Sequence, residues 1–78
     1  MENKELRNSL KTILKNMLFI ELEDGSMFYS NGHTDIELTF NYMSIEILVE
    51  IDEDYEEEQT FLYKDMKSIL KTISLYVN

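Results

Sequence analysis

The sequence predicts one two-layer α+β domain, residues 1–78, in which a three- or four-stranded antiparallel meander is flanked by an N-terminal and a C-terminal helix. Three observations predict this class. Apolar residues recur every three or four positions near both ends of the chain, they alternate with polar residues in the middle, and two glycine turns interrupt the alternation. The expected order is α-β-β-(β)-β-α, with both helices on one face of the sheet.

The N-terminal helix is predicted from apolar residues that fall on one helical face. They are Leu6, Leu10, Ile13, Leu14 and Met17. A second stripe at the same spacing is basic, and it is most simply a solvated face. It consists of Lys4, Arg7, Lys11 and Lys15.

The first part of the sheet is predicted from alternation followed by turns. The apolar positions expected to face the helices are Leu18, Ile20 and Leu22. Asp-Gly at 24–25 and Asn-Gly at 31–32 are hairpin signals. Residues 27–30 between them are either a return strand or a loop, so the sheet has either three or four strands.

Two further strands are the clearest elements of the sheet. Their inward positions are Ile36, Leu38 and Phe40 in one strand, and Ile45, Ile47, Val49 and Ile51 in the other. Asn41 and Tyr42 are expected to turn the chain between these strands.

The last segment is predicted to be a long helix that begins near Asp54. Asp54 and Glu57 have the spacing of a capping box, and Glu56, Glu57 and Glu58 would lie in the first turn, where carboxylates favour the helix dipole. The expected apolar stripe is Leu62, Met66, Ile69, Ile73 and Tyr76, widened by Leu70 and Val77.

No catalytic residue, metal ligand or cofactor site is predicted, so the chain is not expected to be an enzyme. It has no cysteine, one histidine (His33) beside a turn, and only two glycines, which excludes a thiolate site and a phosphate-binding glycine loop. Asp52, Asp54 and Glu56 have the spacing that opens a calcium loop, but Glu57 stands where that loop needs glycine. With no signal-peptide pattern and no apolar run of about 18 residues, a cytoplasmic protein that does not enter membranes is expected.

The acidic residues are concentrated in the middle of the chain. The net charge is −9, and residues 16–63 contain thirteen acidic residues and no lysine or arginine. Seven acids occur among the nine residues 50–58. On the face opposite the helices, the alternation is expected to gather Glu21, Glu23, Asp35, Glu37, Glu46 and Glu50.

This distribution favours a surface that binds a strongly basic partner. Like charges gathered on one face destabilise a fold by self-repulsion, whereas complementary charge speeds association. Apolar and aromatic residues near the acids are candidate anchors, namely Phe19, Tyr42, Leu48 and Tyr55. Such a face repels phosphates, so a nucleic-acid mimic that occupies a basic groove fits better than direct binding to nucleic acid.

The element order, the acidic balance and two stretches carry a family resemblance. Asp-Glu-Asp-Tyr-Glu-Glu-Glu at 52–58, followed by Phe-Leu-Tyr-Lys-Asp-Met at 61–66, resembles small acidic anti-CRISPR proteins of phages and prophages, in particular a type II-A inhibitor that imitates DNA. The resemblance implies a CRISPR effector as partner, in the cytoplasm of the phage's host cell. With Tyr55 as an anchor, the candidate contact residues are Asp35, Glu37, Glu50, Asp52, Glu53, Asp54, Tyr55, Glu56, Glu57 and Glu58.

Two alternatives stay open. The chain is a small structural or regulatory subunit with a homodimeric or heteromeric apolar interface, for which Leu48, Leu70 and Val77 are the expected contacts. Or it binds nucleic acid through the basic stripe of the first helix. In solution it is expected to be a monomer or a homodimer.

Overall fold

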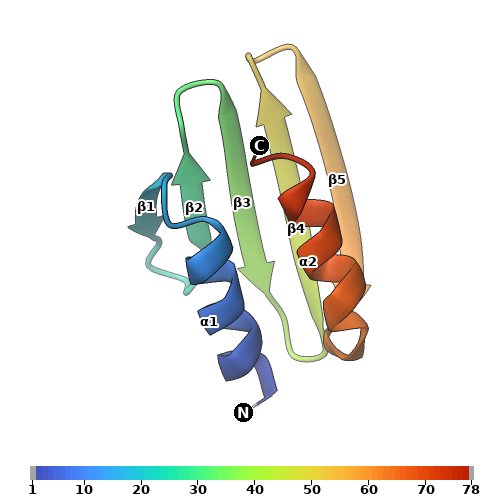
Figure 1. Ribbon diagram of the computed structural model, residues 1–78. Coiled ribbons are helices and arrows are strands. Elements are labelled where there is room, and N and C mark those ends of the chain that lie inside the picture. The colour runs from blue at the N-terminus through green and yellow to red at the C-terminus, as the bar shows by residue number, and fades with distance from the viewer. Residues whose placement is uncertain (1, 78) are drawn as a thin grey trace.

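The fold is a five-stranded antiparallel meander with two helices packed on one face (Figure 1). The computed structural model describes residues 2–77, and the side chains of residues 4–77. The elements are α1 (Glu2–Ile13), β1 (Leu18–Glu21), β2 (Met27–Ser30), β3 (Thr34–Phe40), β4 (Ser44–Ile51), β5 (Tyr55–Leu62), a short 3₁₀ turn η1 (Tyr63–Asp65) and α2 (Met66–Ser74). The strands lie in sequence order from β1 to β5, which confirms the expected α+β meander between two helices.

The core lies between the helices and one face of the sheet. Helix α1 contributes the buried residues Leu6 and Leu10, and α2 contributes Ile69 and Ile73. From the strands, the buried apolar residues are Met27, Tyr29, Ile36, Leu38, Ile45, Ile47 and Val49. Alternate residues of β3 and β4 are buried, as the period of two predicts, and the other face of the sheet is left without a helix over it.

The prediction of a long C-terminal helix from Asp54 is wrong. Residues Tyr55–Leu62 form β5, which pairs with β4 along its whole length, and α2 begins only at Met66. The capping box is therefore absent, and Leu62 lies on a strand and not in a helical stripe. The strand is favoured because β4 would otherwise be an unpaired edge, and because Tyr55, Thr60 and Phe61 are residue types that suit a half-buried strand. The sheet therefore has five strands, and not the three or four predicted.

The orientation predicted for the first strand is also wrong. Leu18 and Ile20 face away from the helices and are 77% and 55% exposed, whereas Phe19 turns toward them. The reason is the pairing with β2, in which Phe19 lies opposite the buried Tyr29 and their ring centroids are 4.9 Å apart. Leu22 lies beyond the strand and is itself exposed. A shift of one residue inverts every side chain of a strand, so this single contact sets the face of all four residues.

The hairpin turns were predicted correctly. Gly25 and Gly32 have φ angles of 91° and 94°, in the region that favours glycine. The β4–β5 turn has the same requirement without glycine, since Asp52 and Glu53 have φ angles of 54° and 64°. Its closing hydrogen bond runs from the Asp54 amide to the Ile51 carbonyl, at 3.1 Å.

Candidate functional site

The candidate site is the face of the sheet that the helices do not cover, named here the open face. Because side chains alternate along each strand, residues paired on neighbouring strands share a face. The register of β3, β4 and β5 therefore places six carboxylates together, and this set is named the acidic face. Its residues are Asp35, Glu37, Glu46, Glu50, Glu56 and Glu58.

Three of these carboxylates form a row across three strands. Asp35 pairs with Glu50, and Glu50 pairs with Glu56. Directly opposed residues in a sheet have Cβ atoms about 4.5–5.5 Å apart, so Glu50 has a like charge close on both sides. In the next row, Glu37 and Glu58 lie on either side of Leu48.

No described lysine or arginine side chain pairs with the acidic face. Among the side chains of residues 4–77, none of the six carboxylates forms a salt bridge, and the one contact with salt-bridge geometry joins the exposed His33 Nδ1 and Asp52 Oδ1 at 3.1 Å. The strands contain no lysine or arginine. These residues lie on α1, just after α1, on η1 and on α2. Within the described part of the chain, the one side-chain hydrogen bond to these six carboxylates comes from the Asn41 side-chain amide, which donates to Glu46 at 3.1 Å. The charge is therefore available to a partner.

An apolar margin adjoins the acids on the same open face. Leu18 and Ile20 of β1 are exposed there, and Ile20 pairs with the half-buried Phe28, which in turn pairs with Glu37. The alternation predicts that Leu18 and Ile20 face the helices, so neither is among the predicted site residues. Buried apolar anchors beside complementary charge are typical of protein interfaces.

The acidic stretch continues from the open face around one end of the sheet. Asp52, Glu53 and Asp54 form the β4–β5 turn beyond the row that contains Glu50 and Glu56. All three are exposed. The Asp52 amide donates to the His33 carbonyl at 2.8 Å, which ties this turn to the β2–β3 turn.

Two candidate residues lie on the other side of the sheet. Tyr55 and Glu57 point to the helix side, where Glu57 accepts hydrogen bonds from the Tyr55 hydroxyl at 2.8 Å, from the Gln59 amide at 2.9 Å, and from the Tyr76 hydroxyl. The hydrogen bond from Tyr76, followed by that from Tyr55, lowers the pKa of the Glu57 carboxyl. In return, the bond to Glu57 raises the pKa of Tyr76 to about 12. Glu57 thus anchors the end of the C-terminal helical segment to β5.

Several other residues lie elsewhere than the sequence predicts. Glu21 lies on the helix side of β1 and Glu23 lies in a turn, so the prediction that both join the open face is wrong. Of the aromatic anchors, Tyr42 is 95% exposed in the β3–β4 turn, and Phe19 packs on the helix side. Of the expected dimer contacts, Leu48 is on the open face, while Leu70 and Val77 pack against the core.

The basic stripe of α1 is interrupted at its second residue. The Arg7 guanidinium lies over the Phe40 ring, 3.9 Å from its centroid, and one of its nitrogens is 3.6 Å from the Met27 sulfur. Arg7 is therefore engaged inside the molecule. Within residues 4–77 the geometry brings no group of three or more histidine, aspartate or glutamate side chains into position to hold a metal ion.

Comparison with known proteins adds no relative. No protein-family model, curated protein or solved structure matches the chain. No helix in the described part of the chain is long and apolar enough to cross a membrane.

Proposed function

We propose that this chain is an inhibitor that binds the basic nucleic-acid-binding surface of another protein, with the acidic face standing in for a nucleic-acid backbone. The observation that carries the proposal is the row Asp35, Glu50 and Glu56, together with the absence of any salt bridge to the six carboxylates among the described side chains. In this proposal the chain works in the cytoplasm, without catalysis or cofactor. A CRISPR effector is the proposed partner, on the strength of the anti-CRISPR resemblance alone.

The spacing of the charges supports a backbone mimic. Neighbouring strands are about 4.8 Å apart and alternate residues about 6.6 Å apart, so the acidic face covers about 10 Å by 13 Å. Duplex DNA carries about one charge per 1.7 Å of its axis, hence about eight charges in 13 Å over its whole circumference. Six carboxylates on one face give a partner a charge density of the same order.

The energetic cost of the arrangement also supports a selected function. Like charges directly opposed on neighbouring strands destabilise a sheet by about 0.2–1 kcal/mol per pair, where opposite charges would stabilise it by a similar amount. The strands carry two such like pairs, through Glu50, and no lysine or arginine to relieve them. Solubility alone does not require this, because interspersed charges of both signs would serve it.

The test distinguishes binding by the acidic face from an effect of net charge alone. The triple variant Asp35→Lys, Glu50→Lys and Glu56→Lys reverses the row, and the matched control reverses the exposed Glu5, Glu21 and Glu23, which lie elsewhere. Both changes shift net charge by the same amount. Each protein is used to capture partners from the source cell at low salt, and duplex DNA is then added as competitor.

The expected partner is a nucleic-acid-binding protein that wild type and control capture, that duplex DNA displaces, and that the row variant fails to capture. A purified type II-A effector nuclease with its guide RNA gives the direct form of the test, with inhibition of DNA cleavage as readout. Capture by the row variant equal to that of the control, or a complex that DNA does not displace, would contradict the proposal.

A second function is favoured by one observation. Leu18 and Ile20 lie exposed on β1, which is an edge strand, so a subunit interface through this apolar edge is the alternative. It predicts association that strengthens with salt, because salt screens the repulsion between acidic chains and does not screen the apolar contact. Sedimentation at 0.05 M and 1 M NaCl tests the homodimeric form of this alternative, which a monomer at both concentrations rules out.

A further inference from the structure

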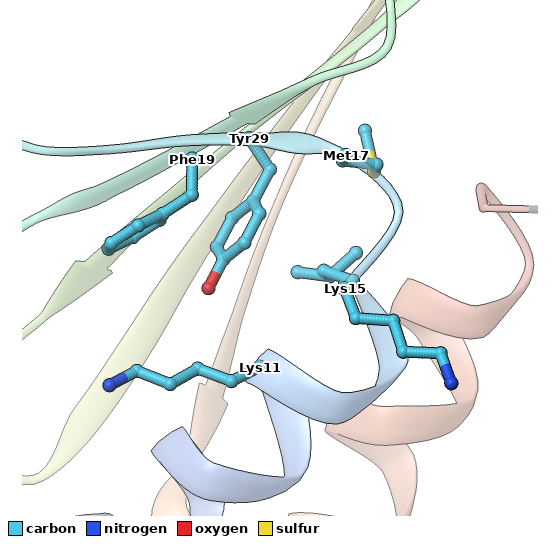
Figure 2. Close-up of a pocket in the computed structure, with 6 residues that line it drawn as sticks. Lys11, Lys15, Met17, Phe19 and Tyr29 are labelled. Carbon is cyan, nitrogen blue, oxygen red and sulfur yellow. The ribbon is translucent and has the colours of Figure 1, made fainter.

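A cavity of about 290 Å³ lies between α1 and β1–β2, on the helix side of the sheet and therefore on the side opposite the acidic face. Its walls are Lys11, Leu14, Lys15, Met17, Phe19 and Tyr29 (Figure 2). The cavity has an apolar wall from α1 and the segment after it, an aromatic wall from the sheet, and lysines at its border. It has no part in the function proposed above, and the inference drawn from it does not depend on that function.

Tyr29 supplies a buried polar atom that the fold does not satisfy. The residue is 3% exposed, and its hydroxyl has no hydrogen-bond partner among the described residues. Figure 2 shows the ring directed from the sheet toward α1, with the hydroxyl between Phe19 and Lys11. A buried hydroxyl without a partner is unfavourable, because it has lost its hydrogen bonds to water. A tyrosine hydroxyl ordinarily has a pKa of 10.0 and burial raises the pKa of Tyr29 further, so the group keeps its proton at neutral pH and is a donor without an acceptor among the described residues.

The two lysines give the cavity a positive border. Lys11 and Lys15 are one helical turn apart and both exposed, and among the described side chains neither forms a salt bridge. Figure 2 shows their side chains extending to opposite sides of the space beneath Tyr29. On a chain of net charge −9, two unpaired cations beside a buried donor form a local site for an anion.

The shape and chemistry of the walls define the ligand. We propose that the cavity binds a small amphipathic carboxylate, with its apolar body against Leu14, Met17 and Phe19 and its carboxylate at the Tyr29 hydroxyl, within reach of the flexible Lys11 and Lys15 side chains. A liquid water occupies about 30 Å³, so the cavity has room for a ligand about the size of a bicyclic aromatic acid. A carboxylate fits better than a phosphate, because it brings one negative charge, and not nearly two, to a chain of net charge −9, and because the donors are one hydroxyl and two ammonium groups with no guanidinium beside them. The single arginine, Arg7, is engaged with Phe40.

The ligand carboxylate reaches the Tyr29 hydroxyl by passing the exposed lysine side chains. Lys11 has a long, flexible side chain at the surface, so its movement opens the path to the Tyr29 hydroxyl without any change in the backbone. The hydroxyl then donates to a carboxylate oxygen, and the two ammonium groups supply the opposite charge. Met17 and Phe19 cover the aromatic body, with sulfur and ring contacts that suit it.

The experiment uses 2-naphthoate and its neutral analogue 2-naphthamide as probes, in ¹H–¹⁵N NMR titrations of the intact chain. Naphthoate is expected to shift the amides of residues 11–19 and 28–30 saturably, with a dissociation constant of about 1 mM, the scale set by about 0.3 kcal/mol for each of its heavy atoms. Naphthamide is expected to bind at least fivefold more weakly. Shifts that do not saturate by about 5 mM, or that lie outside these residues, would overturn the proposal.

Two variants test the two kinds of donor independently. Tyr29→Phe keeps the ring and removes the hydroxyl, and it is expected to weaken naphthoate binding about tenfold, the effect of one hydrogen bond to a charged group. The double variant Lys11→Gln and Lys15→Gln is expected to weaken naphthoate about tenfold and to leave naphthamide unchanged. The matched control is Lys64→Gln with Lys67→Gln, two exposed lysines distant from the cavity in sequence, and it is expected to bind as wild type does. Equal naphthoate affinity in Tyr29→Phe, or in the Lys11 and Lys15 variant, contradicts the assignment even where the other variant fails to fold.

Discussion

Glu50 is the central charge of the acidic face, and its neutralisation is expected to stabilise the fold. It lies directly opposite Asp35 on one side and Glu56 on the other, and no described side chain forms a salt bridge with it. Glu50→Gln keeps the size and the strand position of the side chain and removes both repulsions. A change that weakens the proposed binding function should therefore make the free protein more stable.

The magnitude follows from the geometry of the row. Two unit charges about 6 Å apart in water repel by about 0.7 kcal/mol, so two neighbours contribute about 1.4 kcal/mol before screening. With Debye lengths of about 30 Å at 0.01 M salt, 8 Å at 0.15 M and 3 Å at 1 M, the gain falls from about 1.1 to 0.6 and then to 0.2 kcal/mol. For a domain of this size, about 1 kcal/mol moves the melting temperature by about 4–8 °C.

The assay is thermal and urea unfolding of wild type, Glu50→Gln and the control Glu5→Gln at the three salt concentrations. Glu5 is exposed on α1, and its neutralisation changes net charge equally without relieving the row. Glu50→Gln is expected to be the more stable variant at low salt, with the advantage nearly gone at 1 M. If the control gains as much stability, or if the gain does not respond to salt, the repulsion is not concentrated in the row.

Two further predictions concern the β4–β5 hairpin and its anchor. The folded pKa of Glu57 is lowered, so the stability that Glu57 contributes is present above the ordinary pKa of 4.5 and is lost as pH falls through the folded pKa. The folded pKa of Tyr76 is raised from 10.0 to about 12, so the stability that Tyr76 contributes is present below pH 10 and is lost as pH rises toward 12. Glu57→Gln should lower the melting temperature at pH 7 and flatten both limbs of the stability profile, and limbs unchanged from wild type would show that the contact is not made in solution. Glu53→Gly should stabilise the chain by about 0.5 kcal/mol, since left-handed backbone costs about 1–2 kcal/mol for an ordinary residue and glycine loses about 0.5–1 kcal/mol through entropy. Urea unfolding measures this, with Glu58→Gly as the control that should destabilise a regular strand, and a loss of stability in Glu53→Gly would mean that the turn is not left-handed.

The acidic face could be predicted from the sequence where the alternation was unambiguous. In β3 and β4 the polar positions Asp35, Glu37, Glu46 and Glu50 alternate with aliphatic residues, so period two alone places them opposite the helices. Glu56 and Glu58 completed the face for a different reason. They were candidates because of the acid run, and they joined the face only because their segment is a strand.

The errors arose where a local pattern competed with a distant partner. At residues 54–58 the acids satisfy the rules for a helix start, but pairing with β4 along its full length outweighs a cap worth about 1 kcal/mol. In β1 both faces carry apolar residues, so counting them does not decide the orientation. The contact of Phe19 with Tyr29 decides it, and that contact is invisible in a single strand. The exposed Leu18 and Ile20, and the cavity beside Tyr29, follow from this unpredicted orientation.

The most direct test of the central claim is an NMR titration of the chain with hexalysine, a basic probe with no structure of its own. If the field is focused on the acidic face, the largest shifts occur in the amides of residues 35–37, 48–50 and 56–58, and they vanish at about 0.5 M salt, where the Debye length is about 4 Å. Shifts spread over all the exposed acids, with Glu5, Glu21 and Asp65 as strong as Glu50, would show that the chain is merely acidic and that the open face is not a distinct binding surface.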